Sequence, residues 1–150
     1  MSEEPILKYC LSEEARKAGV QLGCPRPMDA GFDLPALHDV TILPGGFALI
    51  PTGVHFAIPE NWVGLVRDRS SVALKGGAVT AGVIDAAYRG EVRISMHNLS
   101  GEPLSFKRSD RIAQLVVVPH LAGERSSEVS SLTELGSSER GPGGFGSTGR

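Results

Sequence analysis

The chain has 150 residues, a formal net charge of −2 and a hydrophobic fraction of 41%. This length suits one domain with a real core, and 15 basic against 17 acidic residues exclude a strongly basic protein that binds long nucleic acid. Cys10 and Cys24 lack metal-ligand spacing, and we expect no disulfide. With no apolar signal core at its start and no run long enough to span a bilayer, we expect a cytoplasmic location and no membrane partner.

A short helix is predicted close to the N-terminus. Ser12 is a suitable N-cap, and Glu13 and Glu14 match the preference for acidic residues in a first helical turn. Gly19 would end this helix.

Short apolar or alternating segments, separated by Gly- and Pro-containing turns, follow in the middle of the chain. The turns are expected at 44–46, 51–53 and 59–61. Strands are predicted at 41–43, 47–50, 54–58, 62–66, 91–96 and 112–118. Many short strands with frequent turns predict an all-β sandwich or barrel with one short helix.

The composition changes at residue 123, where the chain becomes rich in Ser, Glu and Gly. Val129, Leu132 and Leu135 are the apolar anchors before the last glycine-rich run. We therefore predict a β domain over 1–122 and an extended arm over 123–150.

Residues 140–150 form a glycine-rich run that cannot build a core but can wrap a phosphorylated ligand. Glycines let backbone N–H groups approach phosphate oxygens closely. Arg140 adds a forked cation, and Ser147 and Thr148 add donors. Phe145 offers a face on which a base could stack. The alternative is a disordered glycine-rich tail.

Two polar segments carry charged or hydroxyl groups beside glycine. In the segment 29–34, Asp33 follows a turn glycine and could serve a site or only the turn. In the segment 68–76, Arg69, Ser70 and Ser71 suit a phosphate cradle, and a solvated polar turn is the alternative.

Two further polar residues lie next to apolar ones. Asp85 follows the triplet 82–84, and a carboxylate there could be a general base or could pair with Arg89 at a strand end. Gln114 lies inside an apolar strand, where a buried amide either ties the core or faces a site.

Together, in order and wording, these segments resemble the five signature motifs of the trimeric deoxyuridine triphosphatase (dUTPase) family. The most specific pieces are AGVID..YRGEV, DRIAQLV and RGPGGFGSTG. The resemblance runs from about residue 30 to 149, nearly the whole chain.

The resemblance implies a jelly-roll β fold and a homotrimer with active sites shared between subunits, each closed by a C-terminal arm. It implies that water attacks the α-phosphorus of dUTP in line and gives dUMP and pyrophosphate. Such an activity limits uracil in DNA and supplies dUMP for thymidylate synthesis.

The resemblance also implies roles for residues around the base and sugar. Asp85 would orient and activate the attacking water. Tyr88 would lie under the deoxyribose and leave no room for a ribose 2′-hydroxyl. A hairpin over 77–83 would read uracil mainly through its backbone, and the residues expected at the base are Val79, Gly82, Val83 and Ile84.

At the phosphates, the resemblance implies contacts from four residues of the β domain: Arg69, Ser70, Ser71 and Gln114. It implies that Arg93 is at a position that contacts the nucleotide. From the arm, Arg140 would reach the γ-phosphate and Phe145 would stack over uracil, while the phosphate cradle would be completed by Gly146, Ser147 and Thr148. Mg²⁺ would be carried mainly by the triphosphate, with Asp33 acting through water only and pairing with an arginine.

The chain departs from the family pattern in the second motif, where Asp68 and Ser71 replace the outer residues of Pro-Arg-Ser-Gly. A dCTP deaminase, or a bifunctional enzyme, is one alternative, but Ser95 lies about where that family has its glutamate. A regulatory trimer without enzymatic activity is the other alternative.

Overall fold

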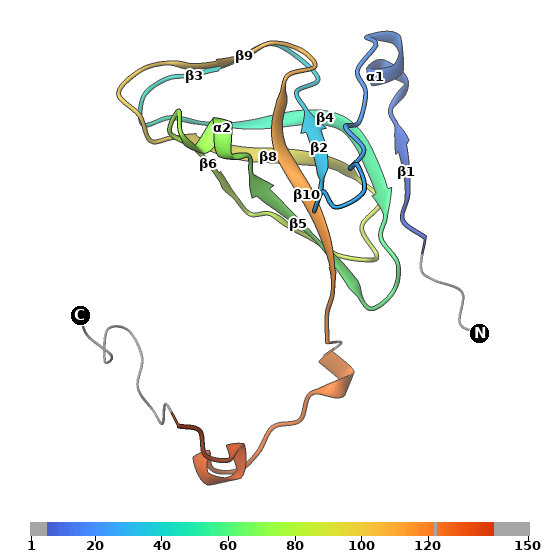
Figure 1. Ribbon diagram of the computed structural model, residues 1–150, viewed down its shortest axis with the longest axis vertical. Helices are drawn as coiled ribbons and strands as arrows, with labels where there is room; N and C mark the ends of the chain where they lie inside the picture. The colour runs from blue at the N-terminus through green and yellow to red at the C-terminus, as the bar shows by residue number, and fades with distance from the viewer. Residues whose placement is uncertain (1–5, 122, 140–150) are drawn as a thin grey trace. The chain divides into compact units, whose positions relative to one another are not determined.

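The computed structural model describes residues 6–121 and 123–139 (Figure 1). The chain divides into two units, Met1–His120 and Leu121–Arg150. The sequence placed this division after residue 122.

Antiparallel strands build the first unit, as the sequence predicts. One four-stranded sheet has the order β1 (Lys8–Leu11), β4 (Phe47–Ala57), β8 (Glu91–Asn98) and β6 (Gly77–Thr80). The second has the order β2 (Phe32–Pro35), β10 (Arg111–Pro119), β5 (Trp62–Asp68) and β7 (Val83–Ile84). A two-stranded sheet pairs β3 (Val40–Ile42) with β9 (Leu104–Phe106). The all-β fold is confirmed, and of the two predicted forms the sheets do not close into a barrel.

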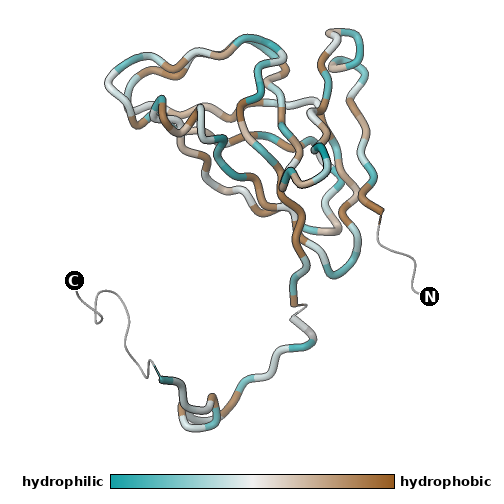
Figure 2. Tube along the Cα trace, viewed as in Figure 1, coloured by the Kyte–Doolittle hydropathy of each residue, from teal (hydrophilic) through white to brown (hydrophobic). Residues whose placement is uncertain are grey.

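The core is built from strands that bury alternate side chains. In β8, Val92, Ile94 and Met96 are buried, whereas Arg93 between them is exposed. In β10, Ile112 and Leu115 are fully buried in the same core. Hydrophobic residues concentrate on the strands, as along the second half of β10 (Figure 2). Burial of these faces fixes the register of both sheets.

The predicted N-terminal helix is confirmed as α1 (Glu13–Lys17). The Ser12 hydroxyl accepts a hydrogen bond from the backbone N–H of Ala15 at 3.1 Å, and Gly19 follows the helix with a left-handed φ of 72°. A second helix that the sequence did not predict, α2 (Ser70–Ala73), follows β5.

The turn predicted at 51–53 is wrong, because β4 runs unbroken through these residues. The hydroxyl of Thr52 donates to the carbonyl of Val92 at 2.6 Å and accepts from the N–H of Val54 at 3.1 Å. The Glu91 carboxylate accepts from the N–H of Gly53 at 2.8 Å, where the register with β8 shifts. Side chains thus satisfy the backbone at this bulge, so the strand does not end.

The second unit contains two 3₁₀ turns, η1 (Gly123–Arg125) and η2 (Leu132–Leu135). Leu132 and Leu135 are exposed. The hydroxyls of Ser130 and Ser131 donate to the carboxylate of Glu134 and lower its pKa below the ordinary value. Among the described residues, no helix has the length and apolar character that crossing a membrane requires.

Candidate active site

A polar cavity of about 390 Å³ opens between the loop before β2 and the start of α2. We call it the cationic cavity. Its lining includes five of the residues predicted to contact ligand or metal, together with residues of the loop, namely Met28, Asp29, Ala30, Gly31, Asp33, Arg69, Ser70, Ser71 and Gln114.

The strand order of the second sheet brings these residues together. Asp33 of β2 is the register partner of Gln114 on the neighbouring strand β10, so their side chains share one face. The strand β5 flanks β10 on its other side and ends at Asp68, and Arg69, Ser70 and Ser71 follow at once. Three segments far apart in the sequence therefore meet at one point.

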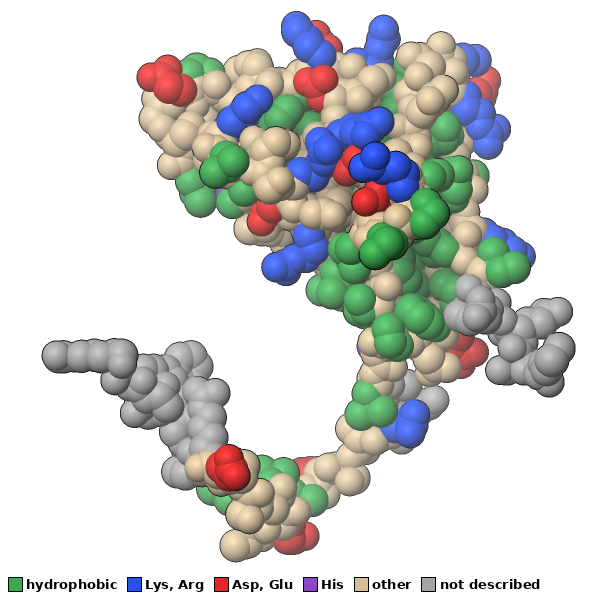
Figure 3. All heavy atoms as spheres, viewed as in Figure 1, with side chains coloured by type: hydrophobic (Ala, Val, Ile, Leu, Met, Phe, Trp, Pro, Cys, Tyr) green, Lys and Arg blue, Asp and Glu red, His purple; other side chains and the backbone are tan. Residues whose placement is uncertain are grey.

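Ion pairs between Asp33 and two arginines fix the charged side chains at the cationic cavity. The Asp33 carboxylate accepts from Nε of Arg69 at 2.8 Å and from Nη1 of Arg111 at 3.2 Å. Nη1 of Arg69 also donates to the backbone carbonyl of Arg111 at 2.8 Å, which fixes the guanidinium plane. Lys and Arg side chains gather around acidic ones on the face drawn in Figure 3. Asp29, the second carboxylate of the lining, pairs with Nε of Arg26 at 3.1 Å. Two guanidiniums face the carboxylate of Asp33, so the cluster of Asp33, Arg69 and Arg111 keeps a positive charge that suits phosphate.

The amide of Gln114 is tied to the end of β5. Its Nε2 donates to the backbone carbonyl of Asp68 at 2.8 Å, and the side chain is half-buried where a buried amide was expected. The amide therefore ties two strands together and also lines the cationic cavity. Gly31 allows the loop to approach, because a Cβ there would lie 2.8 Å from the carbonyl oxygen of Leu115 and 3.3 Å from Oε1 of Gln114.

A second cavity of about 300 Å³ lies beside β7 and the start of β8. We call it the aspartate cavity. It combines the predicted water-activating residue with residues predicted at the base and sugar, and its lining is Leu49, Ala81, Val83, Ile84, Asp85, Tyr88, Glu91 and Arg93.

Tyr88 is held rigidly at the edge of the aspartate cavity. Its backbone N–H donates to the carbonyl of Asp85 at 3.0 Å, and its hydroxyl donates to the carbonyl of Glu91 at 2.8 Å. A Cβ at Gly90 would collide with the hydroxyl oxygen of Tyr88, so any other residue there would push the phenol ring out of this position. The Glu91 carboxylate also binds Nε of Arg93 at 3.0 Å, which holds Arg93 along β8.

Asp85 is exposed, whereas its apolar neighbours suggested partial burial. The alternative that it pairs with Arg89 is wrong in this structure, because Nη1 of Arg89 donates to the carbonyls of Ala86 and Tyr88. Within the described ranges, the carboxylate of Asp85 has no ion-pair partner. It is accessible to a ligand or a water molecule.

The resemblance implied a β-hairpin over 77–83. This is wrong, because the segment crosses from one sheet to the other and its two strands do not pair. Its strand β6 pairs with β8, while β7 pairs with β5. The crossing occurs at Ala81, which has a left-handed φ of 52°, and at Gly82, where a Cβ would lie 2.5 Å from the carbonyl oxygen of Val66. Val79 and Gly82 do not line either cavity; their backbone groups bind β5 instead.

The two cavities have no lining residue in common. Asp33, Arg69, Ser70, Ser71 and Gln114 line one, and Val83, Ile84, Asp85, Tyr88 and Arg93 line the other. The predicted arm residues lie outside the described part of the chain, namely Arg140, Phe145, Gly146, Ser147 and Thr148.

Sequence reasoning missed three residues that organise these cavities. Arg111 is the second partner of Asp33, Glu91 holds both Arg93 and the bulge at Gly53, and Asp68 binds β6. Glu91 is the first residue of the strand predicted at 91–96, Arg111 directly precedes the strand predicted at 112–118, and Asp68 was noted as a departure from the family motif. Their partners are distant in sequence, so no local pattern shows the contacts.

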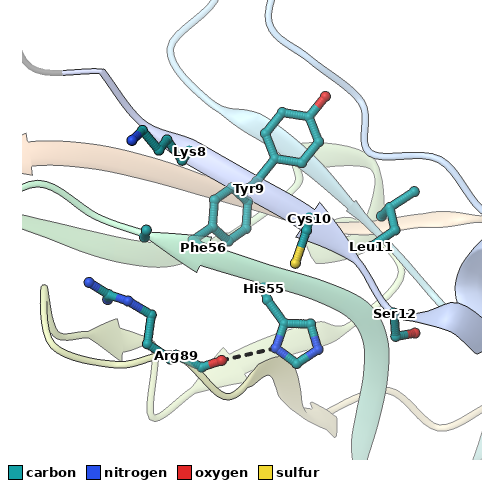
Figure 4. A pocket seen from close by; sticks show the side chains of 9 residues that line it. Lys8, Tyr9, Cys10, Leu11, Ser12, His55, Phe56 and Arg89 are labelled. Carbon is teal, nitrogen blue, oxygen red and sulfur yellow. Dashed lines mark hydrogen bonds between the residues drawn. The ribbon is translucent and has the colours of Figure 1, made fainter.

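A third hollow, of about 370 Å³ and mostly apolar, lies outside both cavities, along β1 and β4 (Figure 4). Nδ1 of His55 is hydrogen-bonded there to the backbone carbonyl of Arg89 at 3.0 Å. The rings of Tyr9 and Phe56 lie side by side. None of the predicted site residues lines it.

A β fold of two four-stranded sheets and one two-stranded sheet, with a cationic cavity and a separate cavity that contains Asp85, defines a protein suited to a phosphorylated ligand. The family model for dUTPase matches residues 22–149. The chain is 48% identical over 127 residues to the deoxyuridine 5'-triphosphate nucleotidohydrolase of Corynebacterium jeikeium (strain K411), covering 82% of this chain and 81% of the relative. The enzyme of the same name from Anaeromyxobacter sp. (strain Fw109-5) is also 48% identical, over 81% of this chain and 82% of its own.

Solved structures agree with this match. A mutant dUTPase of Staphylococcus bacteriophage 80alpha with dUpNHpp superposes with a TM-score of 0.83 at 28% identity, covering 98% of this chain and all (100%) of that chain. A mutant dUTPase from phage phi11 of S. aureus, described with a structural Mg(II) ion, gives a TM-score of 0.74 at 28% identity over 86% of this chain and 99% of that chain. The chain belongs to the dUTPase family.

Proposed function

We propose that this protein hydrolyses dUTP to dUMP and pyrophosphate. The observation that carries the proposal is the pair of cavities. The cationic cavity gathers Arg69, Ser70, Ser71 and Gln114 where phosphates can bind, and the aspartate cavity holds the accessible Asp85 beside Tyr88. The names and the nucleotide of the related enzymes, deoxyuridine 5'-triphosphate nucleotidohydrolase and dUpNHpp, support this substrate.

In the proposed reaction, the oxygen of a water molecule forms a bond to the α-phosphorus, and the bond from that phosphorus to the bridging oxygen of pyrophosphate breaks. Asp85 orients this water and accepts its proton. Arg69 and the hydroxyls of Ser70 and Ser71 compensate the charge on the phosphates, with Arg93 and Gln114 adding donors. Because the guanidinium of Arg69 is already fixed by Asp33, little reorganisation is needed as charge moves toward the leaving group.

Tyr88 and the segment 77–84 select the nucleoside in this proposal. The ring of Tyr88, fixed by its bond to the carbonyl of Glu91, would leave no room for a ribose 2′-hydroxyl. Val83 and Ile84 line the aspartate cavity and would present their backbone to uracil. The N–H of Val79 and the carbonyl of Gly82 are already bound to β5, so these two residues would contribute the carbonyl of Val79 and the N–H of Gly82.

Magnesium fits this site as an ion carried by the triphosphate. The described residues contain no group of three His, Cys, Asp or Glu side chains placed to hold a metal. The Asp33 carboxylate is already bound by Arg69 and Arg111, so it suits contact through water. When bound, Mg²⁺ neutralises phosphate charge, and the phi11 relative has a structural Mg(II) ion.

We further propose that the working form is a homotrimer in the cytoplasm, with each site shared between subunits. Within the first unit, the predicted site residues divide between two cavities, so the phosphate and the water-activating residue would meet only across a contact between copies. The arm would then supply Arg140, Phe145, Gly146, Ser147 and Thr148 to close the site.

The dCTP deaminase and bifunctional alternatives have no support at β8. The hydroxyl of Ser95, where that reaction needs a carboxylate, is within 3.0 Å of the Thr80 hydroxyl, and the imidazole of His97 stacks on Phe47 with ring centroids 5.5 Å apart. A regulatory trimer without activity would not need the accessible Asp85.

The experiment is pyrophosphate release with Mg²⁺ from dUTP, dCTP, dTTP and UTP in parallel, with products separated by chromatography. Release from dUTP alone, with dUMP as the product, is expected. Conversion of dCTP to dUTP or dUMP would favour the deaminase, and no reaction with any of the four would favour the regulatory trimer.

A further inference from the structure

We infer that Asp68 is a positioning residue that sets base selectivity by holding β6 against the phosphate-binding end of β5. This inference rests on the proposed function. Asp68 is the last residue of β5, and the next residue, Arg69, lines the cationic cavity. Figure 1 shows β5, α2 and β6 close together at this end of the fold.

The carboxylate of Asp68 accepts a hydrogen bond at the edge of β6, where a neighbouring strand would otherwise supply the acceptor. Because β6 lies at the edge of its sheet, the N–H groups that point away from β8 have no neighbouring strand to accept them. Oδ1 of Asp68 accepts one of these, the N–H of Val79, at 2.6 Å. This short charge-assisted bond fixes β6 at Val79, two residues before the crossing at Ala81.

The backbone of Asp68 contacts a residue of the cationic cavity. Its carbonyl oxygen accepts from Nε2 of Gln114 at 2.8 Å, and Gln114 lines the cationic cavity. One residue therefore touches the phosphate cluster through its main chain and the base-reading segment through its side chain.

A second hydrogen bond from β5 holds the other end of the base-reading segment. The N–H of Val66 donates to the carbonyl of Gly82 at 2.7 Å, two residues before Asp68 on β5. The segment between Val79 and Gly82, with Ala81 in the left-handed region, is thus held at both ends by β5. Loss of the Asp68 carboxylate would free one end and leave the other bound, so the backbone that reads uracil would shift relative to the phosphates.

The test compares Asp68→Ala, which removes the acceptor, with Asp68→Asn, whose amide oxygen can still accept from Val79. Asp39→Ala is the matched control, because Asp39 also accepts a backbone N–H, that of Arg108 at 2.8 Å, but lies outside both cavities. We measure kcat and KM for dUTP and dCTP, and the hydrogen-exchange rate of the Val79 amide.

For Asp68→Ala we expect KM for dUTP to rise about tenfold, kcat to stay within about threefold, and the preference for dUTP over dCTP to fall about tenfold, the size of one lost charged hydrogen bond. The Val79 amide should exchange faster in Asp68→Ala only. Asp68→Asn and Asp39→Ala should stay close to the parent in all of these quantities.

An active parent with unchanged KM and base preference in Asp68→Ala would overturn this inference and leave the proposed function intact. A parent that does not hydrolyse dUTP would overturn both. If Asp68→Ala does not fold, Asp68→Glu decides the question, because it keeps the charge and displaces the acceptor by one methylene. The same rise in KM is expected there, and parent values would overturn the inference.

Discussion

Asp85 is the residue on which turnover depends in this account. We expect Asp85→Asn to bind a non-hydrolysable dUTP analogue within about threefold of the parent while kcat falls about 100-fold or more, because the amide keeps the shape but cannot accept the proton of water. Steady-state kinetics and calorimetric titration measure the two quantities. Glu60→Gln, an exposed carboxylate outside both cavities, is the control. Parent turnover in Asp85→Asn would remove Asp85 from this role.

Gly90 affects the site through the phenol ring of Tyr88, which lies against it. A methyl group at Gly90 would collide with the phenol of Tyr88 and break its bond to the carbonyl of Glu91. We expect Gly90→Ala to lower kcat/KM for dUTP about tenfold and to lower the preference for dUTP over UTP, because the ring no longer excludes the 2′-hydroxyl. Parallel assays on dUTP and UTP measure both. An unchanged preference would contradict the proposed place of Tyr88 under the sugar.

Asp39 makes a pH-dependent contribution to stability. The backbone N–H of Arg108 and the ammonium of Lys107 lower the pKa of Asp39 below its ordinary value of 3.8. A lowered pKa in the folded state stabilises the fold above the unfolded pKa, and this contribution is lost as pH falls through the folded pKa. Asp39→Asn should therefore melt at a lower temperature than the parent at neutral pH. The difference should shrink as pH is lowered below 3.8, and a difference that stays constant would contradict the assignment.

At the scale of elements, the bulge in β4 depends on one buried hydroxyl. Thr52 is fully buried and bonds both the carbonyl of Val92 and the N–H of Val54. We expect Thr52→Val to lower the free energy of unfolding by about 2–4 kcal/mol, because it leaves two buried backbone groups unpaired. Urea denaturation measures this. Thr41→Val, which removes an exposed hydroxyl paired with Ser105, is the control and should change stability by less than about 0.5 kcal/mol.

The elements that the sequence predicted well are those whose signal is local. The alternation along 91–96 locates β8, and the cap at Ser12 locates α1. The break predicted at 51–53 was wrong because Thr52 and Gly53 are satisfied by Val92 and Glu91, some forty residues away. The helix α2 and the strand β7 are too short to show a period.

At the scale of the whole molecule, the motifs predicted a set of site residues but not the division of these residues between two cavities. Asp33 and Gln114 share a cavity because β2 and β10 are neighbours in register, and Asp85 lies in the other cavity because β7 is on the far side of β5. Strand order is a non-local property, so the sequence pattern could not show that the predicted site residues divide between two cavities.

Mixing two inactive variants tests most directly whether the cationic cavity of one subunit and the aspartate cavity of another form one active site. Asp85→Asn and Arg69→Ala chains are refolded separately and as an equal mixture, and dUTP turnover is measured on the trimer fraction. If each site takes Asp85 and Arg69 from different chains, random mixing leaves about a quarter of the sites intact, so the mixture should recover about a quarter of parent activity. If both residues serve one site from the same chain, every site carries a substitution, and a mixed trimer without recovered activity would contradict the account.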